Sequence, residues 1–165
     1  EVLGIGKTTA EALYKGLIAA GYKMKKDGGV FITVRNSDKA EIGEIAKKYY
    51  DLGFKIYATE GTAKYLNENG VPAERVIWPT EAQNPELAGQ YKQAMEMLAN
   101  KELDLVINVP KNFSTGELTN GYHVRRAAID YNIPLITNAR LATAFIRAFC
   151  AMSIDDIQIK SWDQY

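Results

Sequence analysis

The sequence is poor in the side chains that most often carry metal or redox chemistry. It contains one cysteine, Cys150, and one histidine, His123. These exclude an internal disulfide, a histidine-based metal cluster and paired-histidine catalysis. We expect Cys150 to be a small core residue of an apolar helix, and His123 to lie on a surface or line a helix. Cysteine usage of this kind fits a cytoplasmic protein.

Charge of one sign and long apolar runs are also missing. Twenty basic side chains balance 20 acidic ones, and the pI is near 6.9. The chain therefore has no net electrostatic field that would attract nucleic acid or an anionic membrane, and any anion site must be local. No apolar run approaches the roughly 20 residues of a membrane helix, and no signal peptide is seen. The 165 residues begin at Glu1 without Met, so we expect a part of a longer protein.

What the sequence does contain is a regular alternation of apolar strands and amphipathic helices. Short apolar strands separated by helices predict an α/β three-layer sandwich around a five-stranded parallel sheet. A capping box at Thr8 to Glu11 opens the first helix, and a basic, Gly-rich stretch suggests a boundary, dividing the chain into residues 1–23 and 24–165. The expected strands are 30–34, 53–58, 75–78, 103–108 and 134–137, with a further edge strand at 157–159; the later helices are 38–52, 62–69, 85–98, 122–131 and 138–152.

Polar residues follow the strands at what should be one edge of this sheet. In open parallel sheets, ligands bind at the carboxyl ends of the strands. This set is rich in hydrogen-bonding groups and poor in catalysts, and the sequence has no Gly-rich phosphate loop, nucleophile elbow or Cys-x-x-Cys. Its members are Arg35, Asn36, Ser37, Thr59, Glu60, Gly61, Thr62, Trp78, Asn108, Lys111, Asn112 and Asn138.

The stretch from Gly53 to Thr62 predicts a buried strand, a small polar turn and a helix start. Thr59, Gly61 and Thr62 offer hydroxyl and backbone donors where a helix start favours an anion, although the same residues suit a capped helix with no ligand. Lys39, in the first turn of the preceding helix, would either fold back toward that anion or be a solvated surface charge.

Two residues of this edge, Trp78 and Asn108, have two readings each, and a pair of arginines follows later in the chain. Trp78, at a strand end before Pro79, either fills the core or forms the wall of a pocket, and we favour the pocket. Asn108 can donate and accept, which suits a ligand or the following loop. Arg125 and Arg126 are adjacent on a helix, so their side chains should diverge, and one of them would anchor an interface or a carboxylate.

Five segments together resemble one known family. They are Glu1 to Gly6, Gly53 to Thr62, Asp104 to Asn108, Val124 to Arg126 and Asn132 to Asn138. Nearly the whole chain is similar to the carboxyl-terminal regulatory domain of the large subunit of carbamoyl phosphate synthetase, which has a methylglyoxal-synthase-like fold. The resemblance implies an allosteric domain, with residues 1–21 belonging structurally to the preceding synthetase unit.

The resemblance also implies which residues would bind an effector. In uridylate-regulated members, residues like Lys39, Thr59 and Thr62 hold the phosphate, and a second lysine stands where this chain has Trp78. Members activated by N-acetylglutamate have a Trp-Pro like Trp78-Pro79 and an asparagine like Asn108, but further asparagines where this chain has Lys111 and Gly121. The full set of expected effector-binding residues is Lys39, Thr59, Gly61, Thr62, Trp78, Asn108, Lys111 and Asn112.

For the intact enzyme, the resemblance implies a glutamine-hydrolysing, ATP-dependent ligase that makes carbamoyl phosphate for pyrimidine and arginine biosynthesis. ATP and Mg²⁺ or Mn²⁺ would act in other parts, and this fragment would need no cofactor or metal and be non-catalytic. The expected partners are the rest of the large subunit, a glutaminase small subunit and a small anionic effector, in a cytoplasmic oligomer. Two alternatives remain: a methylglyoxal synthase-type lyase and a structural oligomerisation module. Trp78 to Glu81 replaces the Ser-Gly-Pro and Gly-Gly-Asp motifs of true methylglyoxal synthases, which argues against the lyase.

Overall fold

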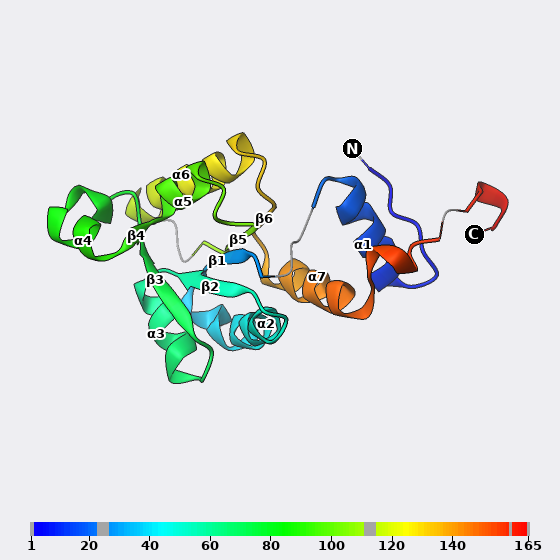
Figure 1. The fold of residues 1–165 in the computed structure, drawn as a ribbon, viewed down its shortest axis with the longest axis horizontal. Helices are drawn as coiled ribbons and strands as arrows, with labels where there is room; N and C mark the ends of the chain where they lie inside the picture. The colour runs from blue at the N-terminus through cyan, green and yellow to red at the C-terminus, as the bar shows by residue number, and fades with distance from the viewer. Residues whose placement is uncertain (1, 23–26, 111–114, 159, 165) are drawn as a thin grey trace.

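The centre of the molecule is a parallel β-sheet. A computed structural model describes residues 2–22, 27–110, 115–158 and 160–164. Six strands lie in the order β4-β3-β2-β1-β5-β6 (Figure 1), and every neighbouring pair is parallel. The α/β prediction is therefore confirmed, with one strand more than expected. The strands are β1 Gly29–Thr33, β2 Lys55–Ala58, β3 Ala73–Ile77, β4 Lys92–Gln93, β5 Leu105–Asn108 and β6 Leu135–Ile136.

Helices cover both faces of this sheet (Figure 1). One face carries α2, α3 and α7, and the other carries α5 and α6. Short 3-10 turns occur at Asn36–Asp38, Glu81–Gln83, Ile154–Asp156 and Trp162–Gln164. The helices are α1 Thr9–Ala19, α2 Lys39–Asp51, α3 Glu60–Glu68, α4 Pro85–Gln90, α5 Ala94–Ala99, α6 Thr115–Asp130 and α7 Ala139–Ala151.

The alternation of side chains along β1 divides the core into two clusters. Val30 and Ile32 point to the face of α2, α3 and α7, whereas Phe31 points to α5 and α6. All three are fully buried, as expected for a central parallel strand that is covered on both faces. Burying each of these side chains contributes about 1.5–3 kcal/mol, so the two clusters fix the positions of the strand ends.

Helix α1 stands apart from the sheet and packs against α7 (Figure 1). Thr8 caps it by accepting a hydrogen bond from Glu11 N at 3.1 Å, which confirms the predicted helix start. The ring of the buried Tyr14 lies 6.4 Å from that of Phe149 in α7. Leu17 also reaches the larger core cluster, so α1 is joined to the sheet layers by apolar contacts.

The predicted single helix over residues 85–98 is wrong. The chain forms α4, leaves helical geometry at Tyr91 (φ −125°, ψ 149°), and then forms the edge strand β4 before α5 begins. Lys92 and Gln93 pair with Val76 and Ile77 of β3. Strand pairing with β3 thus overrides the helical spacing of the apolar residues, which was the only local signal for one long helix.

Two smaller predictions also fail. Cys150 is exposed, because α7 buries the stripe containing Ala142, Phe145 and Ile146, and Cys150 lies on the outward side with Arg147. An apolar sequence run does not distinguish the two sides of a helix. Ile157 and Gln158 are not in a strand, and residue 159 lies outside the described residues.

Candidate functional site

Three buried polar side chains lie side by side at the carboxyl ends of adjacent strands. Thr33 ends β1 and is paired in register with Asn108, the last residue of β5. Thr59 follows β2 and donates from Oγ1 to Thr33 Oγ1 at 3.2 Å in a buried hydrogen bond. Their exposed fractions are 1%, 0% and 2% for Thr33, Asn108 and Thr59. The apolar strands therefore end in a continuous polar row across β2, β1 and β5.

The start of α3 adds a hydroxyl and an ammonium to this row. The helix begins at Glu60, two residues before the predicted start, and Thr59 is its N-cap without a side-chain capping bond. Thr62 is buried, and its Oγ1 has no hydrogen-bond partner among the described residues. Lys39, the first residue of α2, donates from Nζ to Gly61 O at 2.7 Å. The structure thus places the ammonium of Lys39 against Gly61, between Thr59 and Thr62 in the chain, and the binding of an effector by these residues stays a prediction.

An unpaired hydroxyl in this position is unusual and informative. A buried polar group without a partner costs about 1–3 kcal/mol, so native structures keep few of them. Thr62 also lies in the first turn of a helix, where backbone N–H groups and the helix dipole favour an anion. The combination points to an acceptor group of a bound molecule.

Asn108 presents a second unpaired donor at the same edge. Its Oδ1 accepts a hydrogen bond from Arg125 Nη1 at 2.5 Å, whereas its Nδ2 has no partner in the described part of the chain. A Cβ at Gly121 would lie 2.7 Å from Arg125 Nη1, so glycine leaves room for the guanidinium there. Arg126 instead pairs with Asp130 on the exposed side of α6, which confirms that the two arginines diverge.

Trp78 is largely a core residue. Its ring is 8% exposed, lies edge-on to Phe31 with centroids 6.3 Å apart, and belongs to the cluster under α5 and α6. Its backbone N–H donates to Glu81 Oε2 at 2.8 Å, which holds the turn after β3. The pocket-wall role that we favoured is not what this packing shows, and its contact with an effector stays a prediction.

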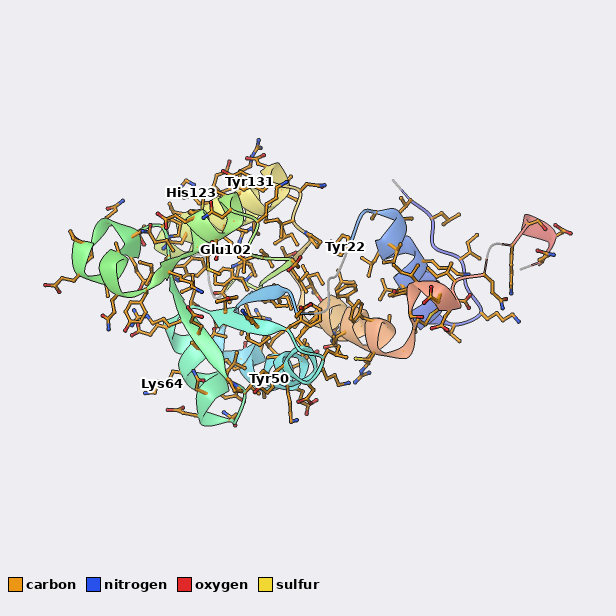
Figure 2. The ribbon with its side chains drawn as sticks, viewed as in Figure 1. Tyr22, Tyr50, Lys64, Glu102, His123 and Tyr131 are labelled. Carbon is orange, nitrogen blue, oxygen red and sulfur yellow. The ribbon has the colours of Figure 1, made fainter. Side chains whose placement is uncertain are left out.

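The remaining predicted residues have varied positions. Asn138 caps α7 by accepting from Leu141 N at 3.1 Å, and Arg35 forms an exposed pair with Asp38. His123 is exposed on the outer side of α6, as expected (Figure 2). Lys111 and Asn112 lie outside the described residues.

Sequence reasoning missed Thr33, Arg75 and Asn120. Thr33 was counted as part of its strand, although a polar residue at the end of an otherwise apolar strand is a usable signal. Asn120 forms a reciprocal pair with Thr80: its Oδ1 accepts from Thr80 N at 3.2 Å and its Nδ2 donates to Thr80 Oγ1 at 2.8 Å. This pair ties α6 to the turn after β3. No local pattern marks such long-range partners.

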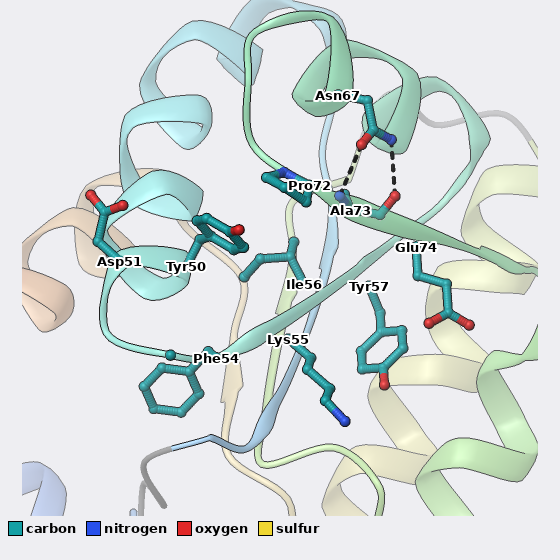
Figure 3. Close-up of a pocket in the computed structure, with 11 residues that line it drawn as sticks. Tyr50, Asp51, Phe54, Lys55, Ile56, Tyr57, Asn67, Pro72, Ala73 and Glu74 are labelled. Atoms are coloured by element: carbon teal, nitrogen blue, oxygen red, sulfur yellow. Dashed lines mark hydrogen bonds between the residues drawn. The ribbon is translucent and has the colours of Figure 1, made fainter.

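The opposite edge of the sheet has a hollow of about 750 Å³ (Figure 3). It lies near the amino ends of β2 and β3, at the amino edge of the sheet, and its lining includes Asn67 and Glu74, whose side chains are paired within the fold. Asn67 uses both ends of its amide on the backbone of Ala73, at 2.9 and 3.0 Å. A side-chain hydrogen bond to Glu74 raises the pKa of nearby Lys92, and the two side chains form an exposed ion pair at 3.2 Å.

Metal binding and membrane insertion find no support in the described residues. No group of three or more His, Cys, Asp or Glu side chains there could hold a metal ion. Across the same residues, every helix is too short or too polar to cross a membrane.

Comparisons with known proteins identify the family of the chain. The MGS-like domain model matches residues 41–137. The chain is 38% identical, over 99% of its length, to the carbamoyl phosphate synthase large chain, C-terminal section, of Methanocaldococcus jannaschii, and covers 25% of that protein. The corresponding section of Aquifex aeolicus is 39% identical over 90% of the chain, which covers 26% of it.

A solved structure and a longer relative complete the comparison. The carbamoyl phosphate synthase large chain of Methanothrix thermoacetophila is 34% identical over 100% of this chain, which spans only 14% of it. Methylglyoxal synthase from Elizabethkingia anophelis NUHP1 superposes with a TM-score of 0.55 at 17% identity, over 86% of this chain and 91% of that one. That likeness concerns the fold alone. The chain belongs to the MGS-like domain family.

Proposed function

We propose that this chain is the allosteric section of a glutamine-hydrolysing carbamoyl phosphate synthase, and that it binds a small anionic effector at the carboxyl edge of its sheet. The observation that carries the proposal is the presence of two buried donors, Thr62 Oγ1 and Asn108 Nδ2, without partners in the described residues. Thr59 and the ammonium of Lys39 lie beside the first of them. Similarity to the carboxyl-terminal sections of synthase large chains supports the same assignment.

The donor set suits an anion with several acceptor oxygens. Hydrogen bonds to a charged acceptor contribute about 1.5–3 kcal/mol each, more than neutral ones. Thr62 and Asn108 would each gain a first partner, so binding would also remove their desolvation penalty. A nucleoside monophosphate or an acid such as N-acetylglutamate fits this chemistry. Allosteric coupling of about 1–3 kcal/mol would be enough to regulate the carbamate-phosphorylating unit.

Catalysis would take place in other sections of the enzyme, where ATP and Mg²⁺ or Mn²⁺ act. At this edge, both oxygens of Glu81 are engaged by Arg75 and by Trp78 N, and His123 is exposed on α6. Neither is placed as a free base. Turnover of dihydroxyacetone phosphate that a Glu81 or His123 substitution abolishes would instead establish a lyase.

Calorimetric titration with uridylate, inosinate and N-acetylglutamate tests the proposal directly. We expect one of them to bind with a measurable heat at a single site. A complete absence of heat with all three, in a chain shown to be folded by circular dichroism, would reject the effector site and favour the structural module.

The same proposal assigns residues 1–23 to the end of the preceding synthetase section. The family model begins only at residue 41, and α1 packs mainly on α7. A chain of residues 24–165 should therefore keep its sheet and its effector binding, with lower thermal stability because the Tyr14–Phe149 contact is lost. Loss of the fold on this truncation would place the boundary elsewhere.

A further inference from the structure

Arg75 of β3 bridges the start of α3 and the turn after β3. Its Nη1 lies 3.1 Å from Glu60 Oε1 and its Nη2 lies 3.4 Å from Glu81 Oε1. The guanidinium carbon Cζ lies over the ring of Tyr91, 4.3 Å from the ring centroid. A planar fork that meets two carboxylates and an aromatic face is held in one orientation, which a lysine could not reproduce.

Each carboxylate leads to a different part of the site. Glu60 is the first residue of α3 and stands between Thr59 and Gly61 in the chain. Glu81 uses its second oxygen, Oε2, to accept the backbone N–H of Trp78 at 2.8 Å. A continuous series of polar contacts therefore runs from Glu60 in the first turn of α3, through Arg75, to the turn at residues 78–81.

On the basis of the proposed function, we infer that Arg75 is a positioning residue that transmits effector binding from the start of α3 to the Trp78 turn. An anion beside Thr59 and Thr62 repels the carboxylate of Glu60, which belongs to the same helical turn. Arg75 is shared between two carboxylates, so weaker attraction to Glu60 strengthens its hold on Glu81. The turn at residues 78–81 then changes its conformation without contacting the anion, because Glu81 accepts the backbone N–H of Trp78.

This role is one of geometry rather than of stability. The side chain of Glu60 is 67% exposed, and exposed ion pairs contribute little to folding. Arg75 itself is 21% exposed, and its Nε has no partner among the described residues. Substitutions of Glu60 or Arg75 should therefore change the environment of Trp78 and have only a small effect on the unfolding midpoint.

The first test needs no ligand. Trp78 and Trp162 are the two tryptophans of the sequence, so Trp162→Phe makes emission report on Trp78. In that background, Arg75→Gln should raise the acrylamide quenching constant at least twofold, with a smaller rise for Arg75→Lys. Glu68→Gln, at the far end of α3, is the matched control and should have no effect. Quenching that Arg75→Gln leaves unchanged would overturn the inference.

The second test separates coupling from binding. The ligand is whichever of uridylate, inosinate and N-acetylglutamate binds with heat. Arg75→Gln should at least halve the change in Trp78 emission that this ligand causes at saturation. The affinity for the ligand should stay within about threefold of that of the unsubstituted chain. Glu60→Gln, at an exposed position that folding tolerates, should show the same loss. Equal emission changes in all variants would refute the coupling alone, whereas no heat in the unsubstituted chain would refute the effector site and the coupling with it.

Discussion

The two edges of the sheet differ in how fully their polar groups are paired. The amino edge has the hollow of about 750 Å³, yet Asn67 there is saturated by backbone groups of Ala63 and Ala73. The carboxyl edge leaves Thr62 Oγ1 and Asn108 Nδ2 without partners in the described part of the chain. These two unsatisfied buried donors, rather than the size of a hollow, are the basis for proposing a ligand at the carboxyl edge.

The largest expected effect comes from replacing one hydrogen-bond donor at the carboxyl edge with a negatively charged acceptor. Asn108→Asp keeps an acceptor for Arg125 Nη1 but puts a carboxylate oxygen where Nδ2 now lies. A charge–charge repulsion of about 4 kcal/mol at 4 Å and an effective dielectric near 20 should weaken effector binding at least 100-fold by calorimetry. The folded state should survive because Arg125 pairs with the new charge. Unchanged affinity would remove Asn108 from the site.

Thr62→Val removes a hydroxyl and keeps the shape of the side chain. Losing one charge-assisted hydrogen bond of about 1.5–3 kcal/mol should weaken binding roughly 10- to 100-fold. The free energy of unfolding should stay the same or rise, since the buried hydroxyl lacks a partner among the described residues. Glu74→Gln, beside the hollow of the amino edge, is the control and should leave the affinity unchanged.

The amino edge should show the opposite behaviour. Asn67→Ala deletes the amide that bonds both backbone groups of Ala73 (Figure 3), so chemical denaturation should show a loss of about 1–2 kcal/mol. Effector affinity should not change. Asn69→Ala is the matched control, because the side chain of Asn69 makes a single bond to Tyr65 O at 2.8 Å. A loss of binding in Asn67→Ala would mean that the two edges are not independent.

The contrast between the edges could be predicted only in part from the sequence. The carboxyl edge follows from the strand–helix alternation, which places Thr59 directly after β2 and Asn108 at the end of β5, with β1 between these two strands. The reach of Arg125 to Asn108 joins residues 17 positions apart, and Thr80 and Asn120 are 40 positions apart. Pairs of that kind depend on how helices pack on the sheet, and no local spacing records them.

The same limit explains the errors in the fold. Strand β4 has two residues and pairs with β3 at the end of the sheet, so its existence depends on tertiary pairing rather than on the propensity of Lys92 and Gln93. Trp78 was ambiguous for a related reason. A large ring at a strand end can face the core or the ligand, and the ring of Trp78 packs against Phe31 in the core.

The smallest expected effect concerns a buried polar group that belongs to neither edge. The hydroxyl of Tyr49 in α2 has no partner among the described residues, and burial, with a minor contribution from Cys150, raises the pKa of Tyr49 well above its usual value. Tyr49→Phe should therefore raise the free energy of unfolding at pH 7 by about 1 kcal/mol, because an unpaired buried hydroxyl is removed.

Because the folded pKa of Tyr49 is the higher one, the unfolded chain loses its phenolic proton first, at a pH near 10. The stability linked to this group is fully present below that pH and is lost as pH rises toward the folded pKa. Tyr49→Phe should remove this alkaline loss, whereas Tyr50→Phe, 45% exposed on the same helix, should not. If Tyr49→Phe were destabilising, its hydroxyl would have a partner in the folded chain, and an unpaired polar atom would lose its value as a sign of a ligand at the carboxyl edge too.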